Sequence, residues 1–149
     1  MVSPAVGLAD SESSLRPPRG RGTQGQRFVI LDQGTSVCDN VSGIVWERIT
    51  SSGATLRTLP QARAWCAAKG PGWQLPEIKD FFTLVDYANA NPPLPSGHPF
   101  TISVNGSYWT DTPVVAPPAN PGDTWNFVLD LGRTFQTGEG GTNYVWCVR

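Results

Sequence analysis

The chain has 149 residues, a length that suits one compact domain and is short for two. Its net charge of -1, from 11 basic and 12 acidic residues, excludes the strong overall field of a dedicated nucleic-acid or anionic-membrane binder. No stretch approaches the roughly 20 apolar residues that a membrane helix requires. We therefore expect neither nucleic acid binding nor membrane insertion.

Residues 1–26 differ in composition from the rest of the chain. They contain few large apolar side chains and end in the Pro, Gly and Arg sequence LRPPRGRGTQGQ. Such a segment buries too little surface to offset its conformational entropy, which predicts an arm that becomes ordered only against neighbouring subunits of an assembly. A solvated linker is the alternative. The residues expected to dock the arm are Arg16, Pro17, Pro18, Arg19 and Arg21.

A folded domain is predicted for residues 27–149, and it opens with strand patterns. RFVIL indicates a short strand, DQGTS a turn and GIVWERI a second strand, because Gly34 and Gly43 mark the breaks. The pattern predicts that two strands precede the first helix.

The first helix has clear boundaries in the sequence. Thr58 and Gln61 form the T-x-x-Q capping box, and the pair Gly70-Pro71 predicts the end of the helix. Spacing along the helix places Trp65 and Cys66 toward its buried side.

A second helix is predicted from about Pro76. Its apolar residues follow the i, i+3, i+4, i+7 spacing of one helix face, and they are Ile78, Phe81, Phe82 and Val85. The sequences NPPLPSGHPF and VVAPPANPGD contain too many prolines for regular structure, which predicts surface loops.

The remaining strand patterns are GSYWTDT, WNFVLDL and NYVWCVR. In WNFVLDL the large apolar residues alternate with Asn126, Val128 and Asp130, which predicts a strand with one buried face. NYVWCVR is expected to pair inside the sheet. Strands, two helices, loops and further strands predict an α+β domain with antiparallel pairing.

The chain has three cysteines at wide spacing, Cys38, Cys66 and Cys147. No CxxC pair is present that could start a zinc site. Two interpretations stay open from the residues alone: one disulfide with one free thiol, or three buried reduced cysteines.

Seven segments, taken in order, resemble a known bacterial family. They are RF, VCDNVSGIVW, LPQARAWCAA, GWQLPEIKDFFTLVD, SYWTDT, WNFVLDLG and VWCVR, and they span residues 27–149. The chain is similar to the Lcl-type C-terminal domain, named from a bacterial collagen-like adhesin and related to C-type lectins and to the formylglycine-generating-enzyme fold. The resemblance implies a C-type-lectin-like fold, with a small twisted antiparallel sheet, two helices and long irregular loops.

The resemblance also implies a disulfide. C-type-lectin-like folds tie the first helix to the last strand, and Cys66 and Cys147 stand at the matching places. The chain departs from the family where Gln74 and Glu77 replace the usual Arg and Thr, so the second helix lacks its usual Thr cap. We expect Glu77 to act through the helix dipole instead.

No catalytic site, cofactor or metal is expected. The single histidine, His98, lies in a proline-rich loop without a recognisable nucleophile motif. The copper-binding cysteine pair of the related formylglycine-generating enzymes has no counterpart, since Cys66 and Cys147 are assigned to the disulfide. No Gly-rich phosphate loop, HExxH motif or EF-hand loop is present.

Five residues are weighed as a ligand site: Tyr108, Trp109, Asp111, Asp123 and Asn126. The two rings could stack on a sugar or a partner, with core packing as the alternative for each. The three polar residues could hold calcium, with loop capping as the alternative. Phe127 stands where sugar-binding C-type lectins carry an Asp ligand, which argues against calcium-dependent sugar binding.

Two functions are open at this point. The first is a non-catalytic, surface-displayed module that decorates a larger extracellular or virion assembly and docks through its arm. The second is an adhesin-type recognition domain that binds glycan or protein ligands through loops 91–107 and 113–123. Both place the protein outside the cell, at a cell surface or on a virion, and the fold alone does not separate them.

Overall fold

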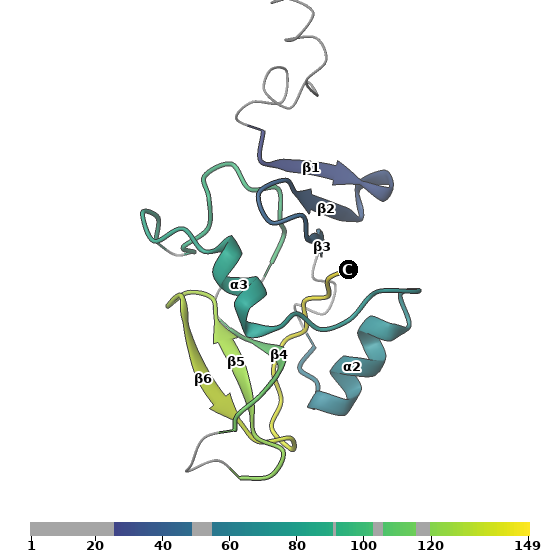
Figure 1. The fold of residues 1–149 in the computed structure, drawn as a ribbon, viewed down its shortest axis with the longest axis vertical. Coiled ribbons are helices and arrows are strands. Elements are labelled where there is room, and N and C mark those ends of the chain that lie inside the picture. The colour runs from purple at the N-terminus through teal and green to yellow at the C-terminus, as the bar shows by residue number, and fades with distance from the viewer. Residues whose placement is uncertain (1–25, 49–54, 91, 103–105, 116–119) are drawn as a thin grey trace, which may run out of the picture.

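The computed structural model describes residues 26–48, 55–90, 92–102, 106–115 and 120–149. Within these ranges the fold is α+β, with two α-helices and two antiparallel sheets of three strands each (Figure 1). The α+β class and the antiparallel pairing are confirmed. The strands before and after the helices form two small antiparallel sheets, where the resemblance implies one. The predicted docking arm lies outside the described residues.

The first sheet has the order β1-β2-β3 and contains Phe28–Leu31, Ser36–Asp39 and Val45–Glu47. The short 3-10 turn Asp32–Gly34 connects β1 to β2. β2 was not predicted, because its sequence SVCD has a weak apolar pattern and ends in a buried carboxylate. The predicted strand in GIVWERI corresponds to β3.

The second sheet has the order β4-β5-β6 and contains Ser107–Pro113, Thr124–Val128 and Arg133–Thr137. β4 and β5 match the strand patterns in GSYWTDT and WNFVLDL. β6 was missed, because its sequence RTFQT has one large apolar residue and lies mostly exposed at the sheet edge.

The alternation predicted for β5 is only partly correct. Phe127 is buried as expected, but Asn126 is buried as well, and Leu131 is 50% exposed. Two causes explain this. Both faces of β5 are covered, and the strand ends at Val128, so the residues beyond it follow a turn instead of the two-residue period.

Helix α2 covers Leu59–Ala67 and begins as predicted. The backbone N–H of Thr58 donates to Oε1 of Gln61 at 3.0 Å, and the N–H of Gln61 donates to the Thr58 hydroxyl at 3.5 Å. Cys66 is fully buried, whereas Trp65 is half-buried at the edge of the same face.

Helix α3 covers Ile78–Leu84, two residues later than the predicted start. The N–H of Glu77 donates to Asp80 at 2.8 Å, and the N–H of Ile78 donates to the hydroxyl of Thr112 on β4 at 2.9 Å. Glu77 and Asp80 thus form a capping box of their own, and Thr112, from another element, binds a further N–H of the first turn. Phe82 is 48% exposed, which corrects its placement on the buried face.

The C-terminal segment 143–149 joins the two sheets. Tyr144 bridges Tyr108 of β4, and Val148 bridges both Trp46 of β3 and Gln74. In Figure 1 this segment, in yellow, runs from β4 past α2 toward β3. The segment was predicted to pair as a strand inside the sheet. It pairs with residues of both sheets, but through isolated bridges and not as a regular strand.

Alternate residues of this segment enter two hydrophobic clusters. Trp146 and Val148 belong to the larger cluster, between α3 and the sheets, while Val145 and Cys147 belong to the smaller one, under α2. The alternation predicted for NYVWCVR is confirmed. Because both faces of the segment are buried, it forms the centre of the core.

The disulfide Cys66–Cys147 is present and joins α2 to this central segment. Its Cα atoms are 5.5 Å apart, and the two residues are separated by 81 positions in sequence. Cys38 is a free cysteine, half-buried on β2. The interpretation as one disulfide and one free thiol is therefore correct.

Candidate binding surface

The two rings weighed as ligand contacts are part of the core. Tyr108 and Trp109 are each 0% exposed and belong to the larger and the smaller hydrophobic cluster respectively. The indole N–H of Trp109 donates to the carbonyl of Arg57 at 2.6 Å. No ligand can stack on rings in these positions, which corrects the expectation for both residues.

The three polar residues weighed for calcium have separate partners. Asp111 pairs with Arg63 at 2.8 Å, and Asp123 accepts the backbone N–H of Asn120 at 2.9 Å. Asn126 is buried, where it donates to Ser107 at 2.6 Å and accepts from the Thr137 hydroxyl at 3.0 Å. The contacts of these three residues are those of ordinary capping and packing, the alternative to calcium binding. Within the described residues, no group of three His, Cys, Asp or Glu could hold an ion.

A different set of side chains forms a cation-aromatic cluster on the surface, which we call the basic-aromatic surface. It consists of Arg57, Trp65, Lys69, Trp73 and Arg149. The guanidinium of Arg57 lies 3.9 Å from the ring centre of Trp65, and the ammonium of Lys69 lies 5.6 Å from it. These distances are within the range of cation–π attraction.

Backbone pairing places the second tryptophan of this surface. Gln74 and Val148 exchange two backbone hydrogen bonds, at 2.8 and 2.9 Å, so the neighbouring residues Trp73 and Arg149 lie side by side. The Arg149 guanidinium is 5.2 Å from the Trp73 ring centre. The surface is therefore assembled from Arg57 just before α2, from α2 itself, from the segment after it and from Arg149.

A pocket of about 370 Å³ lies within this surface. Its lining residues are Asp32, Thr35, Lys69, Trp73 and Arg149. Lys69 pairs with Glu47 at 2.9 Å and Arg149 pairs with Asp32 at 2.7 Å, so carboxylates hold both cations in place beside the rings. Both indole rings remain partly exposed.

Two donors at this surface lack an acceptor among the described residues. They are Nη1 of Arg57 and the indole Nε1 of Trp65, and each is buried. A buried donor without an acceptor costs about 1 to 3 kcal/mol, which favours an oxygen atom from water or from a bound molecule at this place. The surface can offer apolar ring faces and cations to one ligand.

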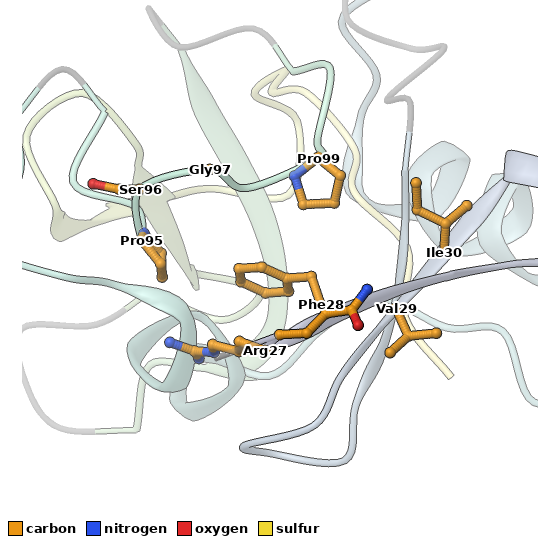
Figure 2. A pocket seen from close by; sticks show the side chains of 9 residues that line it. Arg27, Phe28, Val29, Ile30, Pro95, Ser96, Gly97 and Pro99 are labelled. Carbon is orange, nitrogen blue, oxygen red and sulfur yellow. The ribbon is translucent and has the colours of Figure 1, made fainter. Parts of the chain in front are cut away.

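A larger recess, of about 630 Å³, lies along β1 (Figure 2). One wall consists of residues 26–30, and the other consists of Pro95, Ser96, Gly97 and Pro99. We call this recess the β1 groove. In Figure 2 the loop with Pro95 and Pro99 runs opposite β1, with Phe28 between them.

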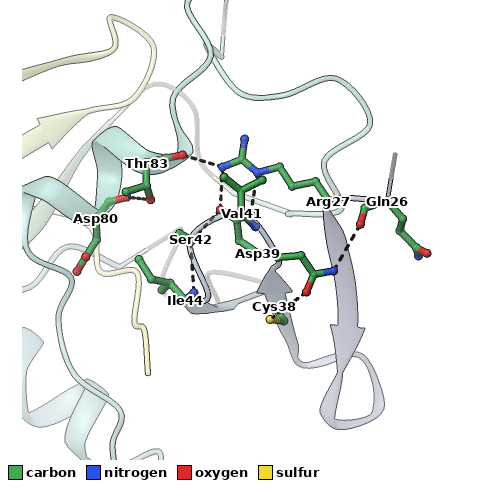
Figure 3. A network of polar contacts seen from close by, with 10 residues as sticks. Gln26, Arg27, Cys38, Asp39, Val41, Ser42, Ile44, Asp80 and Thr83 are labelled. Atoms are coloured by element: carbon green, nitrogen blue, oxygen red, sulfur yellow. Dashed lines mark hydrogen bonds and ion pairs between the residues drawn. The ribbon is translucent and has the colours of Figure 1, made fainter. Parts of the chain in front are cut away.

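A polar network anchors the start of β1 (Figure 3). The guanidinium of Arg27 donates twice to the Asp39 carboxylate, at 2.7 Å each, and also donates to the carbonyl of Thr83 at 2.7 Å. Asp39 accepts further bonds from the N–H of Val41 at 3.0 Å and the hydroxyl of Ser42 at 3.0 Å. This network ties the first sheet to the end of α3.

The same network lowers the pKa of Asp39 below its ordinary value. Burial of the carboxylate opposes its ionisation, but the hydrogen bonds from Arg27, Val41 and Ser42 outweigh burial. The pKa of Arg27 is raised, first by its hydrogen bond to Asp39. The charged pair is thus favoured in the folded state at neutral pH.

We expect Asp39→Asn to lower the free energy of unfolding by about 1 to 3 kcal/mol at pH 7, because a buried charged acceptor is lost. The folded-state pKa of Asp39 is depressed, so its contribution is fully present above the unfolded value of about 3.9 and is lost as the pH falls through the folded pKa. Urea unfolding from pH 7 to pH 2 should therefore show the variant and the wild type converging only in acid.

Asp111→Asn provides the matched control. Asp111 pairs with Arg63, but both side chains are about half exposed, so the change should cost less than about 1 kcal/mol. A difference between Asp39→Asn and the wild type that stays constant down to pH 2 would contradict a depressed pKa.

His98 is half-buried in the loop after α3, and it stacks on Phe100 with ring centres 5.8 Å apart. Its Nδ1 accepts the backbone N–H of Phe100 at 3.3 Å, and burial lowers its pKa. These contacts give the side chain a local structural role in that loop.

Comparison with known proteins identifies the family. The model of the Lcl C-terminal domain matches residues 35–149, and the chain belongs to this family. No curated protein and no solved structure matches the chain significantly. The relation to C-type lectins therefore stays a prediction from the resemblance.

No pattern in the sequence indicated the basic-aromatic surface. Trp73 and Arg149 are 76 positions apart, and only the pairing of Gln74 with Val148 brings them together. Arg57 lies just before α2 and Trp65 lies on it. Because the start of this helix was predicted correctly, the sequence alone could have placed these two residues near each other. Loops 91–107 and 113–123, the expected binding loops, lie partly outside the described residues.

Proposed function

We propose that this chain is a non-catalytic, surface-displayed binding module of the adhesin type, which engages glycan or protein ligands through the basic-aromatic surface. The observation that carries the proposal is the pair of partly exposed tryptophans, Trp65 and Trp73, each with its ring beside a cation. Tryptophan and arginine dominate recognition surfaces, and they are fixed here by α2 and by the core segment 143–149.

Membership of the Lcl C-terminal domain family supports the same class of function, because the resemblance to this family implies an adhesin. The Cys66–Cys147 disulfide supports display outside the cell, since such bonds form and persist in oxidising compartments. In the described residues, no helix is long and apolar enough to cross a membrane.

The absence of catalysis is part of the proposal. The chain has one histidine, and His98 uses Nδ1 for a backbone hydrogen bond and its ring face for Phe100. Two of the three cysteines form the disulfide. A ligand at the basic-aromatic surface meets indole rings, ammonium and guanidinium groups, which suit binding.

A second candidate is a structural subunit that decorates an extracellular or virion assembly and docks through residues 1–26. One observation favours it. Gln26, where the described chain begins, lines the β1 groove, so the predicted arm starts beside an open recess.

We expect Trp73→Ala to weaken ligand binding about tenfold or more, as loss of a central aromatic contact does. The probes are an array of neutral and acidic oligosaccharides and the surface of intact cells, with fluorescently labelled full chain as the analyte. Thermal unfolding of the variant should stay close to the wild type, because Trp73 lies at the edge of the core.

Phe135→Ala is the matched control. Phe135 is 44% exposed and carries Arg133 at 5.3 Å from its ring centre, so it is an equivalent cation-aromatic pair on β6. Its loss should leave binding unchanged. Wild type that binds neither probe would overturn the recognition function, and a loss of binding in Phe135→Ala alone would place the ligand on β6.

A further inference from the structure

The outer edge of β1 has unpaired backbone groups. The N–H of Asn40 donates to the carbonyl of Arg27 at 2.8 Å, which fixes the residues whose groups point toward β2. Because these directions alternate in an antiparallel pair, the N–H and C=O groups of Phe28 and Ile30 point away from β2. Among the described residues, none forms a hydrogen bond with these four groups.

The β1 groove lies along this edge and cannot complete the sheet by itself. Its opposite wall contains Pro95 and Pro99, which have no backbone N–H to donate. Ile30 is 47% exposed in the groove, beside the half-buried ring of Phe28. An extended segment in the groove would pair with the edge and cover Ile30, as in β-strand addition.

We propose that the β1 groove binds residues 5–9 of a second copy of this chain, added as a strand to β1. The sequence of this segment is AVGLA, in which Val6 and Leu8 are two positions apart. In an extended strand they lie on the same face and would cover Ile30 together. The inference rests on the second candidate function, in which the chain is a subunit of an assembly.

Length and composition favour a second copy over the chain's own groove. Residues 10–25, between AVGLA and Gln26, contain one large apolar side chain, Leu15. The sequence Pro17-Pro18 favours an extended backbone over a sharp reversal back to β1. The 17 positions from Ala9 to Gln26 span up to about 55 Å when extended, far enough to reach a neighbouring domain.

Two full-length variants test the proposal. Leu8→Lys places a charge on the segment that would insert and leaves the groove intact. Ile30→Lys places a charge in the groove and leaves the segment intact. In sedimentation velocity we expect the wild type to self-associate with concentration and each variant to associate roughly tenfold or more weakly. An equimolar mixture of the two variants should recover a heterodimer, because one supplies the groove and the other the arm.

Leu131→Lys is the control, since Leu131 is 50% exposed in the turn after β5 and does not line the groove. It should associate like the wild type. A wild type that stays monomeric, variants that associate normally, or a mixture that stays monomeric would each overturn the proposal. None of these outcomes affects the Trp73→Ala test, because the basic-aromatic surface shares no residue with the β1 groove.

Discussion

Removal of the Cys66–Cys147 disulfide is expected to lower the free energy of unfolding by about 4 to 5 kcal/mol. The bond closes a loop of 81 positions, and the chain-entropy model gives this magnitude for a loop of that length. Both cysteines are 0% exposed and lie in the smaller hydrophobic cluster under α2. This amount is close to the whole free energy of unfolding of the less stable small domains.

The double variant Cys66→Ala/Cys147→Ala, compared with wild type in urea denaturation, measures this effect. Cys38→Ala is the control, because Cys38 is free and half-buried, and its loss should cost less than about 1 kcal/mol. Wild type whose unfolding midpoint is unchanged by a reducing agent would contradict the stabilising role of the bond.

Trp146→Ala should destabilise the domain by about 3 to 5 kcal/mol, the usual cost of emptying a large aromatic site in a core. Trp146 is 0% exposed, and its ring centre lies 4.8 Å from Trp46 and 5.1 Å from Phe100. Its indole N–H also donates to the carbonyl of Glu47 at 2.7 Å. The residue thus connects β3, the loop after α3 and the C-terminal segment.

Trp146→Phe separates the two contributions, since it keeps much of the ring and loses the hydrogen bond. We expect a smaller loss, which includes about 1 to 3 kcal/mol for the unpaired acceptor. Trp125→Ala, at a half-buried position, should cost less than Trp146→Ala in the same urea titration. Equal losses at Trp125 and Trp146 would contradict the central place of Trp146.

The parts of the fold that the sequence predicted are those with strong local signals. The capping box of Thr58 and Gln61 depends on residues three positions apart, so helix α2 could be located without knowing its surroundings. The two faces of the C-terminal segment could also be predicted from local sequence. Its alternate residues enter different clusters, as the two-residue period of an extended chain requires.

The parts that could not be predicted depend on distant contacts. β2 and β6 have weak patterns and exist because neighbouring strands supply their hydrogen bonds. Tyr108 and Trp109 are buried on opposite faces of β4, which nothing in SYWTDT distinguishes from an exposed aromatic pair. The burial of Asp39 also depends on a distant contact, since its partner Arg27 is 12 positions away, just before β1.

The position of Trp65 and Trp73 makes the central claim directly measurable. The chain has six tryptophans, and each indole N–H gives a separate signal in a two-dimensional nitrogen-proton NMR spectrum. Trp46, Trp109 and Trp146 are 0% exposed and act as internal references.

The decisive measurement is therefore a titration of isotope-labelled full chain with the best-binding oligosaccharide or protein from the binding assays. The account predicts that the indole signals of Trp65 and Trp73 shift progressively, while the three buried references stay in place. A ligand that binds with unchanged Trp65 and Trp73 signals would contradict recognition through the basic-aromatic surface.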